Sequence, residues 1–290
     1  MAARSGALAD AWTIAQRNAC PRMPHSPTHS PHPLNPHQQA MAEAAEQAYQ
    51  VFGARPRPER LHNHGGPWRD YEFEALMCSL PLREVSARLF YSYFMDPSLD
   101  DHLSEEFLYF LPRILDLLAR GEVPHFALEL TLSNLRECPE GMLDGTELEL
   151  LNRFVMAYFK NLVGPNEWQA RSAKPEDDPL DVLAMTHLAG LPVQPLLDWW
   201  VASDDVRSSQ HFVQSAYWNW WGPSCSMHPF LEDESGFLAV LQAWLADPTV
   251  RARWRAKLAE PAFQGLARRE FGFGPVPVSE MLAVALAELG

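Results

Sequence analysis

The chain has 290 residues, of which 47% are hydrophobic and 21% are charged, and its formal net charge is −14. A chain of this length and hydrophobic content can bury a sizeable core, which excludes a wholly disordered protein. The excess of acidic residues also argues against a DNA or RNA partner, because affinity for nucleic acid comes mainly from lysine and arginine.

The first 40 residues carry no pattern of a folded or exported segment. Residues 1–20 lack the apolar region of a secretory signal peptide, and residues 21–39 contain six prolines and four histidines. We therefore expect residues 1–40 to form a disordered N-terminal extension. The missing export signal predicts a cytoplasmic location, and the few, widely spaced cysteines are expected to be reduced thiols: Cys20, Cys78, Cys138 and Cys225.

Beyond residue 40 the composition favours helices over strands. Leucine and alanine dominate, whereas isoleucine occurs only at positions 14 and 114, a balance typical of helical chains. We predict an all-α fold with about a dozen short antiparallel helices in an irregular helical array or bundle. No run approaches the roughly 18–20 apolar residues that cross a bilayer, so we expect a soluble protein with no membrane partner.

The stretch LHNHGGPWRD at residues 61–70 places two histidines one residue apart, ahead of two glycines and a proline. Imidazole nitrogens bind zinc, and His62 and His64 could supply two of the three or four protein ligands that a zinc site needs. Further ligands could come from three places: Cys78, His102, and the pair Cys225 and His228. The glycines and the proline equally suit a polar turn without metal, which is the interpretation we favour.

Residues 96–149 hold 13 acidic side chains and 3 basic ones. Such an excess is typical of a solvated surface, but it also suits a docking surface for a basic partner. The docking hypothesis assigns binding to the acids that precede and open the most apolar helix: Asp100, Asp101, Glu105 and Glu106.

The stretch EEFLYFLPRILDLL at residues 105–118 predicts a buried helix with a proline inside it. Pro112 removes a backbone donor and clashes with the preceding turn, so we expect the helix to bend or break there. Arg113 follows in an otherwise apolar segment. It could bind an anion, although a structural salt bridge is the role we favour.

Two spacings further along the chain predict helices. His125 and Glu129 are four residues apart and would share one helical face, as an acid–base pair, a metal-binding pair or an ordinary surface pair. Thr146 and Glu149 have the spacing of a capping box, which predicts a helix from residue 146 that ends before Gly164-Pro165.

Residues 164–179, GPNEWQARSAKPEDDP, are polar and bounded by prolines. We predict that they form a linker or a long surface loop between an N-terminal helical half, residues 41–163, and a C-terminal half, residues 180–290. Two Asp-Pro pairs, Asp178-Pro179 and Asp247-Pro248, predict helix starts with an acidic N-cap.

Tryptophans concentrate at positions 199, 200, 218, 220 and 221. The last three lie on different faces of a helix that we expect Ser203 to cap and to run to Trp221. Large aromatic residues gather both in cores and in binding hot spots. Core packing is the interpretation we favour, and an interface or ligand groove formed by Trp218, Trp220 and Trp221 is the alternative.

Four segments carry a resemblance: FGARPRPERL (52–61), EEFLYFLPRILDLLARGE (105–122), AYWNWW (216–221) and AWLADPTVRARWRAKLAEPAF (243–263). Together they resemble a group of bacterial all-helical proteins without an assigned activity, over most of residues 45–265. The resemblance implies an all-helical fold and supplies no catalytic residue. Members of the group often carry closely spaced cysteines just after the RPERL-like segment, where this chain has His62 and His64.

Two functional hypotheses follow from the sequence. The first is a protein–protein interaction or regulatory module that binds another protein, a basic one, through the acidic face and the tryptophan-rich region. The second is a metal-binding domain or metal-dependent enzyme centred on His62 and His64, with zinc as the metal. An enzyme is the less favoured reading because the sequence contains no G-x-G-x-x-G, Walker-type loop, H-E-x-x-H or G-x-S-x-G motif.

Overall fold

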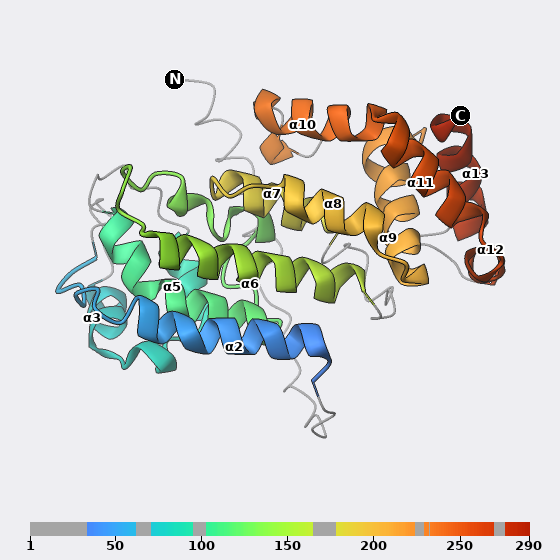
Figure 1. The fold of residues 1–290 in the computed structure, drawn as a ribbon. Coiled ribbons are helices and arrows are strands. Elements are labelled where there is room, and N and C mark those ends of the chain that lie inside the picture. The colour runs from blue at the N-terminus through green and yellow to red at the C-terminus, as the bar shows by residue number, and fades with distance from the viewer. Residues whose placement is uncertain are drawn as a thin grey trace. The chain divides into compact units, whose positions relative to one another are not determined.

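The computed structural model describes residues 34–61, 71–94, 103–164, 178–223, 229–231, 233–269 and 276–290. Every regular element in these ranges is a helix, which confirms the predicted all-α fold (Figure 1). The α-helices are α2 (Pro36–Val51), α3 (Tyr71–Ser79), α4 (Ala87–Phe94), α5 (Leu103–Ala119), α6 (Gly145–Val163), α7 (Pro179–Leu188), α8 (Gln194–Ala202), α9 (Val206–Ala216), α10 (Ser235–Ala246), α11 (Pro248–Ala259), α12 (Pro261–Ala267) and α13 (Val278–Leu289). The shorter elements are the 3-10 turns η2 (Leu82–Glu84), η3 (Leu128–Leu130), η4 (Ser133–Leu135) and η6 (Pro229–Leu231), and the π-helical turn η5 (Tyr217–Trp221).

Helix α2 begins earlier than the sequence analysis predicted. The Asn35 side chain caps it by accepting hydrogen bonds from the backbone amides of His37 (2.9 Å) and Gln38 (2.8 Å). The Gln38 side chain in turn accepts a bond from the Asn35 amide (3.0 Å), which completes a capping box ahead of a proline at the first helical position. The predicted boundary is therefore wrong, because residues 36–40 were assigned to the extension and are helical.

Helix α5 supplies much of the core around α2 and α6. Seven of its apolar side chains have no exposure: Phe107, Leu108, Phe110, Leu111, Ile114, Leu115 and Leu117. Helix α2 packs against both α5 and α6, and the three run side by side in Figure 1. Pro112 lies inside α5, which continues through it to Ala119, so the helix does not break at the proline.

The start of α6 corrects a second prediction. Asp144, and not Thr146, is the N-cap: its side chain accepts bonds from the amides of Thr146 (2.7 Å) and Glu147 (2.8 Å). The Glu147 carboxylate in turn accepts a bond from the Asp144 amide (2.8 Å), so the capping box is Asp144 with Glu147. The sequence carries two overlapping patterns here, and the earlier one forms the cap.

The segment around His125 is not an α-helix. His125 lies in a bend before η3, and its Nδ1 accepts a bond from the Ala127 amide (3.2 Å). His125 and Glu129 therefore do not share a helical face, although both are buried. Their four-residue spacing carries no acid–base pair of the helical kind that the sequence suggested.

Three helix starts in the second half of the chain involve acidic caps. Asp178 and Asp247 cap α7 and α11 with a proline at the first position, as predicted. Helix α9 is capped by Asp205, which accepts a bond from the Arg207 amide (2.8 Å). The prediction that Ser203 is this cap is wrong, since Ser203 ends α8.

The helices before and after residues 164–179 pack on each other. Helix α6 contacts α7, α8 and α9, and Asn35–Gly290 form one compact unit. An aromatic cluster joins the elements of the second half: the Phe212 ring stacks on Trp254 with centroids 3.8 Å apart, and Trp200 lies edge-on to both. No helix in the described ranges is both long and apolar enough to span a bilayer.

Candidate binding cavity beside a π-helical turn

The chain leaves α9 through a π-helical turn at Tyr217–Trp221. The Gly222 amide closes this turn by donating to the Tyr217 carbonyl (2.9 Å), a bond one residue longer than that of an α-helix. A Cβ at Gly222 would lie 2.2 Å from the same carbonyl oxygen, so glycine is required here. Single π-helical turns are rare and frequently mark functional sites, because they shift the register of the side chains that follow.

A buried polar cluster fixes the turn to the start of α7. The Asp178 carboxylate accepts bonds from the Ser215 hydroxyl (2.7 Å), the Asn219 side-chain amide (3.1 Å) and the Leu180 backbone amide (2.8 Å). Asn219 also donates to the Ser215 hydroxyl (3.2 Å). One N-cap aspartate thus holds both the first turn of α7 and the middle of the π-helical turn.

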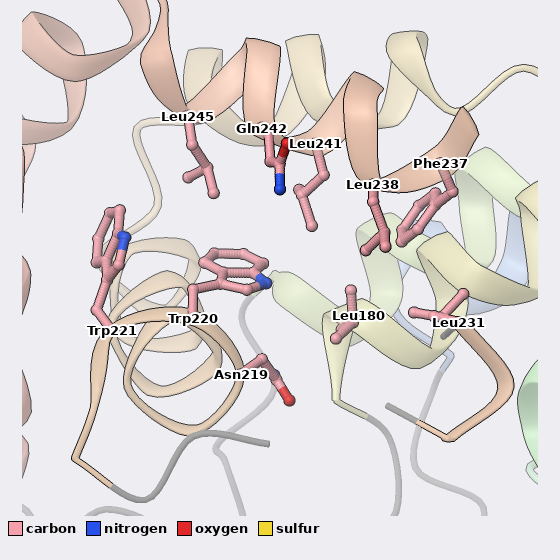
Figure 2. Close-up of a pocket in the computed structure, with 10 residues that line it drawn as sticks. All are labelled: Leu180, Asn219, Trp220, Trp221, Leu231, Phe237, Leu238, Leu241, Gln242 and Leu245. Atoms are coloured by element: carbon pink, nitrogen blue, oxygen red, sulfur yellow. The ribbon is translucent and has the colours of Figure 1, made fainter. Parts of the chain in front are cut away.

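The π-helical turn, α7, η6 and α10 enclose a cavity of about 250 Å³ (Figure 2). Its floor is apolar and almost fully buried: Leu180, Leu231, Phe237 and Leu241. Its rim is more exposed and consists of Asn219, Trp220, Trp221, Leu238, Gln242 and Leu245. Figure 2 shows the Trp220 ring facing Leu241 and Gln242 of α10. Among the residues that the structure describes, none of those that line the cavity is charged.

Both rim tryptophans rest on the aromatic core. The Phe212 ring lies 6.2 Å from Trp220 and 5.8 Å from Trp221, centroid to centroid, and the two indoles are 6.1 Å apart. Phe212 itself has no exposure. The contacts with Phe212 limit the motion of both indoles. The two rings therefore form a preorganised wall for an apolar group that enters the cavity.

The third tryptophan of the predicted binding set behaves differently. Trp218 is half-buried, packs edge-on against Tyr217 with centroids 5.0 Å apart, and does not line the cavity. Trp200, by contrast, has no exposure and belongs to the core. The tryptophan-rich region therefore divides between core packing and a cavity rim.

Two of the four acids of the predicted acidic face, Glu105 and Glu106, are among the described residues. Asp100 and Asp101 lie outside the described residues. Glu105 is exposed, but Glu106 is 4% exposed because it shares the inner face of α5 with Phe110 and Ile114. Assigning Glu106 to a docking surface is therefore wrong.

Arg113 has structural partners for its guanidinium group. Its Nε donates to the Val85 carbonyl (2.8 Å), and Nη1 pairs with the Asp116 carboxylate. The side chain is buried on α5. These contacts agree with the salt-bridge role that the sequence analysis favoured and leave the anion-binding alternative without support.

The predicted metal residues, His62 and His64, lie outside the described residues, as do three of their candidate partners: His102, Cys225 and His228. Among the residues that the structure does describe, no group of three or more histidines, cysteines or acids could hold a metal ion. Cys78 is described, and its burial together with the nearby Glu106 and Glu74 raises the thiol pKa to about 11. That thiol is therefore protonated at neutral pH.

Other buried titratable groups lie away from the cavity. Burial lowers the pKa of His211 to about 3, with a smaller contribution from the Arg207 charge, and burial lowers the pKa of His125 to about 4. Burial, followed by the charge of Arg253, lowers the pKa of Lys257 to about 7. The Lys257 amine donates to the Trp200 carbonyl (3.2 Å) at the end of α8, a structural contact of the kind that helix C-termini attract.

Comparison of the chain with protein-family models, with curated proteins and with solved structures gave no significant match. The assignment of the cavity as a candidate binding site therefore depends on its geometry alone. Sequence analysis singled out Trp220 and Trp221 but missed the other residues that line the cavity: Leu180, Asn219, Leu231, Phe237, Leu238, Leu241, Gln242 and Leu245. The available signal was the position of Asn219 between the tryptophans, together with an α10 that contains no charged residue.

Proposed function

We propose that this chain is a helical protein–protein interaction module, and that its cavity receives an apolar side chain from a partner protein. The cavity carries the proposal: it has a buried apolar floor and a rim with two tryptophans, and none of the described residues that line it is charged. Interfaces are enriched in aromatic residues, and their hot spots sit in well-packed pockets of this kind.

The size of the cavity supports a side chain as the occupant. Pockets for drug-sized ligands and cofactors measure roughly 300–1,000 Å³, whereas this cavity measures about 250 Å³. A single leucine, phenylalanine or tryptophan side chain would bury its apolar surface there. We propose a protein rather than a nucleic acid or a membrane as its partner, because the chain is acidic, and we propose the cytoplasm as its location.

The test compares affinity capture from native lysate by wild-type protein and by a Trp220→Ala variant. Truncation of a hot-spot tryptophan costs at least about 2 kcal/mol, so we expect roughly 30-fold weaker binding of the partner. Trp199→Ala is the matched control, since Trp199 is half-buried and does not line the cavity. If no captured protein depends on Trp220 and the variant is folded by circular dichroism, the proposal fails.

A contribution from the acidic residues to the same interaction remains part of the proposal. Glu105 is exposed on the first turn of α5, and Asp100 and Asp101 precede it in the sequence. Charge reversal at Asp100, Asp101 and Glu105 should weaken capture of a basic partner. Unchanged capture would remove these acids from the binding surface.

One contact favours a second candidate, a zinc site at His62 and His64. The Leu61 amide donates to the Glu74 carboxylate (2.9 Å), and Glu74 is buried. A buried acid thus reaches the residue directly before His62. Metal analysis should compare full-length protein that lacks His25, His29 and His32 with the same protein carrying His62→Ala and His64→Ala. Zinc in the first and not in the second would support this candidate, and its absence from both would exclude it.

A further inference from the structure

The exposed side of α10 extends the surface beside the cavity. Helix α10 contains no charged residue, and apart from Ser235 and Gln242 its exposed residues are small or apolar: Gly236, Ala239, Val240, Ala243 and Ala246. Val240 is 39% exposed. Helical periodicity places Gln242 between this exposed side and the side formed by Leu238, Leu241 and Leu245, which lines the cavity. A segment that inserts a side chain past Gln242 would therefore also lie along α10.

Carboxylates terminate this uncharged surface at both ends. Asp233 is exposed just before α10, and Asp247 is exposed just after it. Neither forms an ion pair in the described part of the chain. The neighbouring Glu234 differs, because it pairs with Arg136 (2.8 Å) and with His187 (3.0 Å). Helix α10 has twelve residues and a length of about 18 Å, and the two exposed acids flank its two ends.

The charges disfavour a second copy of this chain as the occupant. Two α10 helices packed antiparallel would bring Asp233 of one copy to Asp247 of the other, and parallel packing would bring identical acids together. The formal net charge of −14 adds long-range repulsion to either arrangement. A segment with positive charges at both ends would instead meet a carboxylate at each end.

We infer that the partner segment has an apolar anchor side chain flanked on both sides by lysine or arginine, the anchor entering the cavity and the flanking cations reaching Asp233 and Asp247. This inference rests on the proposed function and specifies its partner. The α10 length of about 18 Å corresponds to about 12 residues of a partner helix, or to five or six residues of an extended segment.

The test selects binders from a random peptide library displayed on phage, using the full-length chain as target and removing peptides that also bind the Trp220→Ala variant. We expect the remaining peptides to share an apolar anchor with lysine or arginine on both sides. The best peptide is then synthesised, and its affinity is measured by fluorescence anisotropy.

The decisive variant is Asp233→Asn with Asp247→Asn. Asparagine is as good an N-cap as aspartate, so the start of α11 should survive the loss of charge. We expect the peptide to bind about 3- to 10-fold more weakly, with a weaker dependence on salt. The matched control, Glu140→Gln with Glu149→Gln, removes the same number of exposed charges elsewhere and should leave the affinity unchanged.

The outcomes separate this inference from the proposed function. Peptides that require Trp220 but show no basic residues, or that bind the Asp233 and Asp247 variant as tightly as wild type, would overturn the inference and leave the proposed function standing. A selection that yields no Trp220-dependent peptide would overturn both. Self-association that is abolished by Val240→Glu in sedimentation experiments would make a second copy the occupant and also overturn the inference.

Discussion

Gln214 shows how one buried side chain departs from ordinary packing. It has no exposure on α9, and neither its amide nitrogen nor its amide oxygen has a hydrogen-bond partner in the described part of the chain. Burial of an unsatisfied amide costs roughly 1–3 kcal/mol, whereas an apolar group of similar length would avoid that cost. A methionine fits this description, because it is unbranched and adapts to irregular spaces.

We therefore predict that Gln214→Met raises the free energy of unfolding by about 1–3 kcal/mol, measured by urea denaturation. Gln210→Met on the same helix is the control. The Gln210 side chain accepts a bond from Arg207 (2.7 Å) and is buried, so its replacement should lower stability. A lower stability for Gln214→Met would mean that an ordered water or another group satisfies the amide.

At the level of single residues, the sequence predicted which kinds of side chain could bind a partner, but not how buried each one is or what it contacts. It could identify Trp220 and Trp221 as candidates for binding because large aromatic residues are conspicuous. It could not separate Glu105 from Glu106, since burial depends on how α5 rotates against its neighbours. It also could not show that Asn219 bonds to Asp178, because the two residues are 41 positions apart and meet only through tertiary packing.

At the level of elements, helix starts were predictable where an acid precedes a proline. Asp178 and Asp247 cap their helices as expected, because the proline has no amide to satisfy and its backbone angle suits the first turn. The predicted N-cap of α6, Thr146, lies two residues after the observed cap, Asp144, since both Asp144 with Glu147 and Thr146 with Glu149 fit the capping pattern. The π-helical turn had no sequence signal, because YWNWW suits an α-helix equally well.

The two capping patterns of α6 predict different mutational effects. Asp144→Ala should lower the free energy of unfolding by about 1 kcal/mol, because two amides of the first turn lose their acceptor. Thr146→Ala should change it little, and Asp144→Asn should preserve the cap. Thermal and urea denaturation of the three variants would check this. A larger loss for Thr146→Ala than for Asp144→Ala would contradict the observed cap.

At the level of the whole molecule, composition predicted the fold class but not the packing. A chain rich in leucine and alanine with frequent helix stop signals favours short helices. Which helices pack together was not predictable, because the contacts join helices that are far apart in the sequence. Helix α9, for example, packs against α6, α7, α11, α12 and α13. The cavity depends on this packing, since its lining residues come from four elements between Leu180 and Leu245. A local pattern cannot report such an arrangement.

The core also makes the stability of the whole molecule depend on pH through His125 and His211. Both are buried, and burial lowers their pKa values in the folded chain to about 4 and about 3. In the unfolded chain each takes up a proton near pH 6.5. The unfolded state therefore binds more protons below pH 6.5, and the free energy of unfolding falls as the pH decreases.

We predict that each of these histidines lowers the free energy of unfolding by about 2.5 kcal/mol between pH 7.5 and pH 4.5. Urea denaturation at a series of pH values should show this decrease in the wild type. His125→Gln and His211→Gln should each remove about half of the histidine contribution, and the double variant should retain only the decrease caused by carboxyl groups. A double variant as acid-sensitive as wild type would show that these histidines are already charged in the folded chain at pH 4.5.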